Sequence, residues 1–290
     1  MTLKTIDERL DALSPDMKRT LERYGFDARR FRELAGKVQG GSPEDNVVRG
    51  RVSPPEPSDV QALPAAGTAE RARLEALGRQ ELEAGRVALL VLAGGMATRM
   101  GGVVKALVEA LPGRTFLDLR LAEIEAVGRQ FGRTPPLWLM TSHTTEGPIR
   151  SALGSRLKDD AVAIFSQFLS LRLTPSGDVF LDAQGRPSEH APGHGDVPEA
   201  LQRSGLIQRF VDRGGRVVLV TNLDNLGGTL EPAIIGWHLD HAEPVTSEVV
   251  DKLENDKGGI PVRVDGKTCV LEEFRIPSSF DPATVRVFNT

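Results

Sequence analysis

The stretch VALLVLAGGMATRMGGVVK, from Val87 to Lys105, decides the fold that we predict for this chain. Its first seven residues, Val87 to Ala93, form an unbroken apolar run, which is typical of a strand buried on both faces of a parallel sheet. Two glycines, Gly94 and Gly95, follow at once. Because ligands of open parallel sheets bind at the carboxyl ends of the strands, this turn lies where a ligand site is expected.

The turn after the apolar run has the composition of an anion-binding loop. Backbone N–H groups at Gly94 and Gly95 can approach phosphate because no Cβ stands in the way. Arg99 and Lys105 add two cations, and a guanidinium suits bidentate contact with phosphate oxygens. The stretch matches neither a Walker loop nor the GxGxxG dinucleotide fingerprint. It therefore predicts a phosphate cradle of another kind, against the alternative of a plain tight turn between a strand and a helix.

Outward from this stretch, apolar runs alternate with helical patterns. Strands are predicted at 137–141, 162–165 and 217–221, with helices at 116–131, 147–153 and 197–213. This alternation favours a mostly parallel, doubly wound sheet with helices on both faces. A hairpin is predicted over 171–181, and added antiparallel strands are predicted at 247–251, 262–264 and 268–273.

The residues before the first strand are predicted to be helices and a long loop. Apolar residues recur at helical spacing over 6–21, with a new helix start at Ser14. Further helices are expected over 28–38 and 68–84. Residues 39–64 are rich in Pro, Gly and Ser and have no sustained period, as in a linker or a surface loop.

Composition disfavours several classes of function. The 290 residues are 40% hydrophobic and 26% charged, as in an ordinary globular protein. The 36 basic residues are outnumbered by 40 acidic ones, so the net charge of -4 disfavours a general nucleic-acid binder. The single cysteine, Cys269, excludes a disulfide framework. Since we find no apolar run of membrane-spanning length and no secretory core at the N-terminus, we expect a cytoplasmic protein without a membrane partner.

Two further motifs carry polar groups that suit a phosphate site. In PGHGD, Gly193 and Gly195 flank His194, which favours an irregular backbone that presents the imidazole or nearby N–H groups. In TNLDNLGG, Asn222 and Asp224 alternate after an apolar strand, so both side chains leave it on one side. Mg²⁺ usually takes one or two carboxylates together with phosphate oxygens and water, so Asp224 is a candidate ligand.

These motifs together resemble the UTP–glucose-1-phosphate uridylyltransferase family, the UDP-glucose pyrophosphorylases of the eukaryotic-like type. The shared motifs are LAGGMATRMG with the lysine after it, TFLDL at 115–119, Phe165-Ser166-Gln167, PGHGD and TNLDNLGG, with KGG at 257–259 and the terminal FNT. The resemblance covers about Leu77 to Thr290. It implies a Rossmann-like, GT-A-like nucleotidyltransferase fold with added antiparallel strands. We accordingly assign residues 1–66 to an N-terminal helical extension and linker, and 67–290 to a nucleotidyltransferase domain without its C-terminal part.

The resemblance also implies a reaction and roles for residues. UTP and glucose 1-phosphate would give UDP-glucose and pyrophosphate, with Mg²⁺ as cofactor. Arg99 and Lys105 are the expected catalytic residues, and Asp224 is the expected metal ligand. The expected nucleotide-binding residues are Leu92, Ala93, Gly94, Gly95, Lys105, Gln167, Gly193 and His194, where Gln167 and Gly193 would read the uracil ring. The expected sugar-binding residues are Asn222, Gly259, Glu273 and Asn289.

Departures from the family pattern keep two alternatives open. Arg99 is more typical of UDP-N-acetylhexosamine pyrophosphorylases, so a UDP-N-acetylhexosamine or broad UDP-sugar pyrophosphorylase is the first alternative. The family continues past FNT into further strands and a C-terminal domain often used in oligomerisation. We therefore expect poor turnover and an oligomer only through that missing region, and a non-catalytic UTP or UDP-sugar binding module is the second alternative. Because adjacent strand residues point to opposite faces, at most one of Glu272 and Glu273 is expected to reach the pocket.

Overall fold

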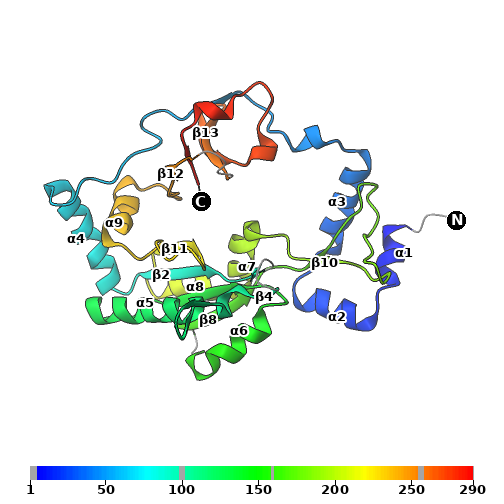
Figure 1. Cartoon of the computed structure of the whole chain (residues 1–290), viewed down its shortest axis with the longest axis horizontal. Coiled ribbons are helices and arrows are strands. Elements are labelled where there is room, and N and C mark those ends of the chain that lie inside the picture. Colours follow the sequence, from blue (N-terminus) through cyan, green and yellow to red (C-terminus); the bar gives the residue numbers. More distant parts are fainter. Residues whose placement is uncertain (1–4, 98–101, 158–159, 254–257, 290) are drawn as a thin grey trace. The chain divides into compact units, whose positions relative to one another are not determined.

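The computed structural model describes residues 5–97, 102–157, 160–253 and 258–289. Contacts divide the chain into two compact units (Figure 1). The first unit comprises Met1–Gln39 and Arg73–Gly236, and the second comprises Gly40–Ala72 and Trp237–Thr290. These boundaries differ from the boundary predicted after residue 66, because the N-terminal helices share a unit with the parallel sheet. The assignment of 67–290 to a nucleotidyltransferase domain stays a prediction.

The first unit is built on a parallel sheet with the strand order β11-β2-β7-β8 (Figure 1). Its strands are β2 (Val87–Leu92), β7 (Leu137–Thr141), β8 (Val162–Ser166) and β11 (Val217–Asn222). β2 runs parallel to both of its neighbours, with Leu92 opposite Asn222 on one side and Met140 on the other. The carboxyl ends of the strands therefore meet at one edge of the sheet, as the doubly wound pattern predicts.

Helices cover both faces of this sheet. They are α5 (Phe116–Phe131), α6 (Glu146–Leu153), α7 (Val197–Ser204) and α8 (Leu206–Asp212). Two further helices, α4 (Ala69–Glu83) and α9 (Pro232–His241), pack on one another at Gly78 and Gly236. The connections β2-α5-β7 and β7-α6-β8 step across the sheet in one direction, whereas α7 and α8 lead back from β8 to β11. Because crossovers between parallel strands are right-handed, α5 and α6 lie on one face and α7 and α8 on the other.

Alternate residues of the strands form the core against α7 and α8. This core contains Ala88, Leu90, Trp138, Met140, Ala163 and Phe165 from the strands, with Ala200, Leu201, Leu206 and Phe210 from the helices. The rings of Trp138 and Phe210 meet edge to face, with their centroids 5.3 Å apart. Leu89 and Leu139, each one residue along its strand, are also buried and point to the opposite face. β2 is thus packed on both faces, which explains its unbroken apolar sequence.

The N-terminal extension packs on the segment that follows β8. It consists of α1 (Ile6–Asp11), α2 (Pro15–Arg23) and α3 (Ala28–Gly40). Ser14 caps α2 by accepting a hydrogen bond from the Met17 N–H, as the Ser-Pro pair predicts. Leu21 and Phe31 share one core with Leu171 and neighbouring residues of that segment. The extension is therefore part of the first unit.

An antiparallel hairpin lies in the same segment. Its short strands are β9 (Ser170–Leu171) and β10 (Glu189–His190), which pair with one another. Between them Leu173 bridges Val179, with Gly177 in the turn at φ +77°, so the hairpin predicted here is confirmed. Arg9 of α1 donates two hydrogen bonds, of 3.1 and 2.7 Å, to the carboxylate of Asp178. These bonds fasten α1 to the hairpin turn.

The second unit is made of antiparallel strands. Its sheet has the order β1 (Val52–Ser53), β13 (Ile260–Val264) and β14 (Lys267–Leu271), and β12 (Val250–Asp251) pairs with β15 (Val287–Phe288). Arg263 donates hydrogen bonds of 2.6 and 2.8 Å to the carboxylate of Asp59, and Thr268 donates a third of 3.0 Å. The bonds from Arg263 above all hold the pKa of Asp59 well below its ordinary value, against burial. Asp59 thus fastens the long 39–64 segment to the sheet.

The predicted elements differ from the observed ones most clearly in three places. The helix expected over 197–213 is two helices, because Gly205 between α7 and α8 has φ +72°, where glycine ends a helix readily. The loop expected over 39–64 contains β1 and a 3-10 turn at Pro43–Asn46. The strand expected over 247–251 is confined to Val250–Asp251. β1 and β12 are held by pairing with distant strands, so no local pattern marks their limits.

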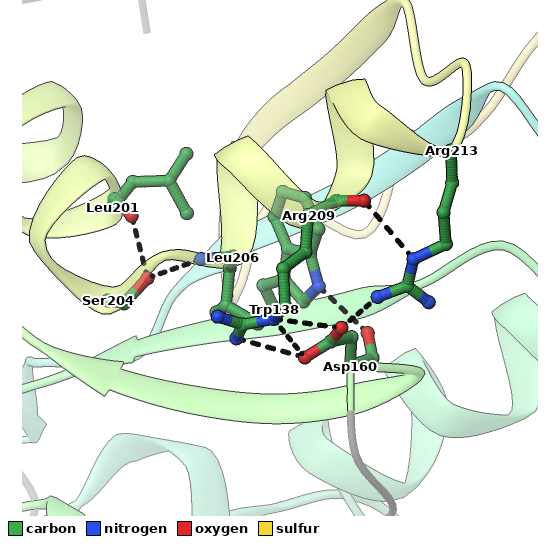
Figure 2. Close-up of polar contacts among 7 residues, drawn as sticks. All are labelled: Trp138, Asp160, Leu201, Ser204, Leu206, Arg209 and Arg213. Atoms are coloured by element: carbon green, nitrogen blue, oxygen red, sulfur yellow. Dashed lines mark hydrogen bonds and ion pairs between the residues drawn. The ribbon is translucent and has the colours of Figure 1, made fainter.

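Figure 2 shows how Asp160 fastens α8 to the start of β8. Arg209 donates to its carboxylate at 3.0 Å, Arg213 donates to it as well, and the indole N–H of Trp138 donates to its backbone carbonyl at 3.0 Å. The hydrogen bonds from Arg209 hold the pKa of Asp160 below its ordinary value, against burial, and those from Arg213 add to the lowering. The Asp160 carboxylate therefore keeps its charge to lower pH than an unpaired aspartate does.

Among the described residues, none of the helices is long and apolar enough to cross a membrane. The cytoplasmic location expected from the sequence stays a prediction.

Substitution of Gly236 by Ala should destabilise the first unit. A Cβ at Gly236 in α9 would lie 2.0 Å from the Leu74 carbonyl oxygen of α4, and one at Gly78 of α4 would lie 1.9 Å from the Pro232 carbonyl oxygen. We expect Gly236→Ala to lower the free energy of unfolding by about 1–3 kcal/mol, measured in urea. The control is Gly36→Ala in α3, where a Cβ meets nothing within 4 Å. The control should gain about 0.5–1 kcal/mol, and an equal gain for Gly236→Ala would contradict this packing.

The contribution of Asp160 should depend on pH. A carboxylate with a lowered pKa in the folded state stabilises it above the ordinary pKa of about 3.9, and this stabilisation is lost as the pH falls through the folded pKa. Asp160→Asn should therefore unfold at lower temperature than the wild type at pH 7, and the difference should shrink below about pH 4. Asp11→Asn, at an exposed position of α1, is the control. A difference that stays constant down to pH 2 would contradict this account.

Candidate functional site

The glycine turn continues directly from the central strand. Ala93 is buried, and its N–H donates to the Met140 carbonyl oxygen at 2.8 Å. Gly94 is half-buried and Gly95 is exposed, so the backbone emerges from the core over these residues. The next residues form β3 (Met96–Ala97), which pairs antiparallel with β4 (Val103–Val104). This pairing returns the chain to the turn. The predicted Arg99 lies outside the described residues.

Lys105 and Asp224 meet beside the turn. Because β4 ends at Val104, the Lys105 N–H lies against the turn and donates to the Gly95 carbonyl oxygen at 3.2 Å. The Lys105 ammonium lies 3.0 Å from a carboxylate oxygen of Asp224, which follows β11. Both side chains are partly open to solvent, with exposed fractions of 37% and 46%. The structure thus brings together the cation predicted to bind phosphate and the predicted metal ligand, which are 119 residues apart in sequence.

Gln167 lies against Gly94. Its residue is 6% exposed, and its N–H continues the pairing of β8 by donating to the Thr141 carbonyl oxygen at 2.9 Å. A Cβ added at Gly94 would stand 2.8 Å from Nε2 of Gln167. A side chain at position 94 would therefore have to displace the amide of Gln167.

The PGHGD motif is connected to the same segment. Gly193 has φ +119°, a conformation open in practice to glycine alone, and exposed His194 begins a short 3-10 turn. Asp196 accepts a hydrogen bond of 3.1 Å from the Phe168 N–H, next to Gln167 in the chain. Burial raises the pKa of Asp196. The motif and Gln167 are thus held to each other through a side chain that the sequence analysis did not select.

Asn222 ends β11 opposite Leu92, the last residue of β2. Its backbone carbonyl accepts a hydrogen bond of 3.1 Å from Arg120 of α5. Arg120 is fully buried. It was not predicted as a site residue, because its sequence does not distinguish it from the exposed charged residues of an amphipathic helix.

The other predicted sugar-binding residues belong to the second unit. The Asn289 N–H donates to the Gly259 carbonyl oxygen at 2.8 Å, and the Asn289 amide donates to the Glu248 carbonyl oxygen at 2.8 Å. Glu273 lines an open cavity of about 520 Å³ together with Gly258, Glu272 and Phe274. Both Glu272 and Glu273 line this cavity, and the expectation that at most one of them reaches the substrate pocket stays a prediction. β14 ends at Leu271, so the alternation of a strand does not extend to either residue.

Hydroxyl groups after β7 hold the glycine turn from behind. Ser142 Oγ donates to the Gly94 carbonyl oxygen and Thr145 Oγ1 donates to that of Ala93, both at 3.0 Å. With both carbonyl oxygens engaged, the turn is fixed by side chains from a neighbouring strand end. Their sequence signal is a run of polar residues, 141–145, directly after an apolar strand.

A buried carboxylate behind these hydroxyls reaches the N-terminal extension. Glu146 accepts hydrogen bonds from the Tyr24 hydroxyl at 2.8 Å and from Ser166 Oγ at 3.1 Å, and it pairs with Arg150 at 3.2 Å. Burial acts to raise the pKa of Glu146, but the hydrogen bonds from Tyr24, Arg150 and Ser166 outweigh it and leave the pKa below its ordinary value. Burial also raises the pKa of Tyr24, and its hydrogen bond to Glu146 raises that pKa further.

The described residues contain no cluster of three or more His, Cys, Asp or Glu side chains that could hold a metal ion. Asp224 offers one partly exposed carboxylate beside the glycine turn. One carboxylate suffices for Mg²⁺ when phosphate oxygens and water supply the remaining ligands. Asp224 therefore fits a Mg²⁺ ion that arrives with a polyphosphate. The two histidines of α9 are engaged elsewhere: the His238 ring contacts the Thr246 hydroxyl, and the His241 ring contacts Trp237.

Sequence comparison connects the chain with one family. Residues 31–290 match the family UTP--glucose-1-phosphate uridylyltransferase. The protein of that name from Saccharomyces cerevisiae is 33% identical over 203 residues, which cover 66% of this chain and 40% of the relative. The one from Musa acuminata is 28% identical over 272 residues, which cover 89% of this chain and 54% of the relative. The chain thus matches only about half, or less, of the length of these relatives.

Solved structures share the fold. The uridine diphosphate N-acetylglucosamine pyrophosphorylase from Trypanosoma brucei superposes with a TM-score of 0.74 at 24% identity, covering 98% of this chain and 62% of that one. The UDP-glucose phosphorylase from Trypanosoma brucei superposes with a TM-score of 0.70 at 23% identity, covering 98% of this chain and 58% of that one. The α/β fold with a parallel sheet, antiparallel additions and N-terminal helices, predicted from sequence, is confirmed.

Proposed function

Because the chain belongs to the UTP–glucose-1-phosphate uridylyltransferase family, we propose that it transfers a uridylyl group from UTP to a sugar 1-phosphate and releases pyrophosphate. The observation that carries the proposal is the convergence of the Gly94 turn, Gln167, Lys105 and Asp224 at the carboxyl edge of the parallel sheet. The match to a family of this activity and the geometry of a phosphate site support the same reaction.

This reaction requires no nucleophile from the protein. A phosphate oxygen of the sugar 1-phosphate attacks the α-phosphorus of UTP, and the bond from that phosphorus to the α–β bridging oxygen breaks. The electron pair of that bond leaves with pyrophosphate. The protein has to align two anions and offset their repulsion, which positioned cations and N–H groups do.

Lys105 and Asp224 have matched parts in this scheme. In the structure the ammonium and the carboxylate neutralise one another. When UTP binds, Lys105 would turn to the triphosphate and Asp224 would hold Mg²⁺. Both the bound Mg²⁺ and the Lys105 ammonium would offset negative charge on the phosphate oxygens. Arg99 is proposed as the second catalytic cation. The backbone of Leu92, Ala93 and Gly95, with His194, would complete the nucleotide site.

Gln167 is the proposed reader of the uracil ring, together with Gly193. An amide presents both a donor and an acceptor, which matches the N3–H and the carbonyl oxygens of uracil. The tight approach of Gln167 to Gly94 supports this role, because it fixes the amide directly beside the turn that would bind the nucleotide.

Glucose 1-phosphate is the proposed acceptor. The relatives that are 33% and 28% identical to the chain carry glucose 1-phosphate in their names, which supports this choice. Asn222, Gly259, Glu273 and Asn289 are the proposed hexose-facing residues. Arg99 favours an N-acetylhexosamine 1-phosphate or a broader set of sugar 1-phosphates instead. Assays with several sugar 1-phosphates therefore distinguish between these acceptors.

Asp224→Asn should abolish most of the activity. We expect pyrophosphate release from UTP and glucose 1-phosphate with Mg²⁺ to fall by about 100-fold or more, since one positioned electrostatic group is worth that much. Glucose, N-acetylglucosamine and galactose 1-phosphates form the panel of acceptors, and Asp11→Asn is the control. Unchanged turnover in Asp224→Asn would refute the metal assignment. Binding of UTP by the wild type without any pyrophosphate release would instead support a non-catalytic binding module.

Gly94→Ala should weaken recognition of uracil. The new Cβ would displace the amide of Gln167, so we expect UTP affinity to fall by about 10-fold or more, the equivalent of one or two hydrogen bonds. Calorimetric titration with UTP, CTP and ATP should reveal a smaller preference for UTP. Gly147→Ala in α6 is the control, because a Cβ at that position meets nothing within 4 Å. Equal losses for all three nucleotides would contradict base reading by Gln167.

A further inference from the structure

We propose that Arg120 is a positioning residue that holds the loop 222–228 in the shape that presents Asp224 to Mg²⁺ and the nucleotide phosphates. The inference rests on the proposed function and names a residue outside the motifs that suggested it. Arg120 lies in α5, 104 positions before Asp224 in sequence, and the two side chains share no hydrogen bond or ion pair among those of the described residues.

The guanidinium of Arg120 donates hydrogen bonds to three backbone carbonyls of the loop. Its side chain is fully buried. Nη2 donates to the Asn222 carbonyl oxygen at 3.1 Å and to that of Asn225, while Nη1 donates to the Gly228 carbonyl oxygen at 3.2 Å. Glu123, one turn along α5, accepts a bond of 2.6 Å from Nη1 and balances the charge. One side chain thus fixes the start, the middle and the end of the loop.

The loop is closed around this contact. The Asn225 N–H donates to the Asn222 carbonyl oxygen at 3.2 Å, and the Gly228 N–H donates to the Asn225 carbonyl oxygen at 3.1 Å. A Cβ at Gly228 would lie 2.5 Å from Thr221 Oγ1, so the last residue also lies close to the strand. With the carbonyls of 222, 225 and 228 turned toward Arg120, the carboxylate of Asp224 is left at the surface beside Lys105.

Lysine is the informative replacement for Arg120. A planar guanidinium reaches three acceptors from two separate nitrogens, whereas an ammonium keeps the charge but bonds from a single nitrogen. Arg120→Lys therefore leaves the balance with Glu123 in place and loosens the loop. Arg216→Lys is the matched control, because Arg216 pairs with buried Glu81 at 2.8 Å next to the amino end of β11, away from Asp224.

The experiment measures the Mg²⁺ concentration at which UTP binding is half-maximal, by calorimetry with the full chain. We expect Arg120→Lys to raise this concentration by about 10-fold, as the loss of a group that orients a ligand does, and Arg216→Lys to leave it unchanged. In an Asp224→Asn background, Arg120→Lys should cause no further change. The thermal unfolding midpoint of each variant is measured as well, to show that the variant is folded.

Two outcomes of the Mg²⁺ titration with Arg120→Lys would overturn the proposal. One is a Mg²⁺ midpoint for Arg120→Lys that differs from the wild type no more than that of Arg216→Lys. The other is a full 10-fold effect of Arg120→Lys that persists without the Asp224 carboxylate. If Arg120→Lys does not fold, Glu123→Gln replaces it, because it weakens the hydrogen bond from Nη1 that holds the guanidinium of Arg120 in place under the loop. A raised Mg²⁺ midpoint is expected there too, and an unchanged one overturns the proposal.

Hydrogen exchange separates this proposal from the proposed function. In the variant used, the amides of Asn225 and Gly228 should exchange at least about 10-fold faster than in the wild type, while those of β2 keep their rates. If the wild type binds no UTP with Mg²⁺, the proposed function is wrong, and exchange still decides whether Arg120 orders the loop. Unchanged exchange in the loop overturns the positioning role whatever the binding data are.

Discussion

The burial of β2 on both faces and its pairing on both edges determine where the strand ends that carry the candidate site lie. Because the strand is apolar throughout, it can lie only at the centre of the sheet, and its neighbours β7 and β11 end level with it. Polar residues begin where these strands stop. The glycine turn, the hydroxyls of Ser142 and Thr145, and Asn222 therefore share one edge.

A second layer of contacts gives this edge its shape. Carbonyl oxygens of the glycine turn are occupied by Ser142 and Thr145, and carbonyl oxygens of the loop 222–228 are occupied by Arg120. In both cases side chains from a neighbouring element satisfy the backbone acceptors. This arrangement suits a reaction in which the protein aligns two phosphorylated substrates and contributes no covalent step.

Prediction from sequence succeeded where periodic burial dominates. The buried strand at 137–141 and the helix at 116–131 were predicted with their observed limits, because apolar spacing reports burial directly. It failed where distant residues decide, as in β1, which exists through its pairing with β13. Within the site, glycines and Asp224 carry local signals, whereas Arg120 acquires its role from carbonyls more than a hundred residues away.

We expect the edge formed by the Gly94 turn, Gln167, Lys105 and Asp224 to bind UTP with Mg²⁺. A crystal structure of the chain grown with UTP and MgCl₂ tests it most directly. In that crystal structure the uracil ring should lie within hydrogen-bonding distance of the Gln167 amide and the triphosphate over the turn. Mg²⁺ should be bound to Asp224, and the Lys105 ammonium should contact phosphate oxygens. A nucleotide bound elsewhere, or one bound here with Lys105 still paired to Asp224 and no cation on that carboxylate, would contradict it.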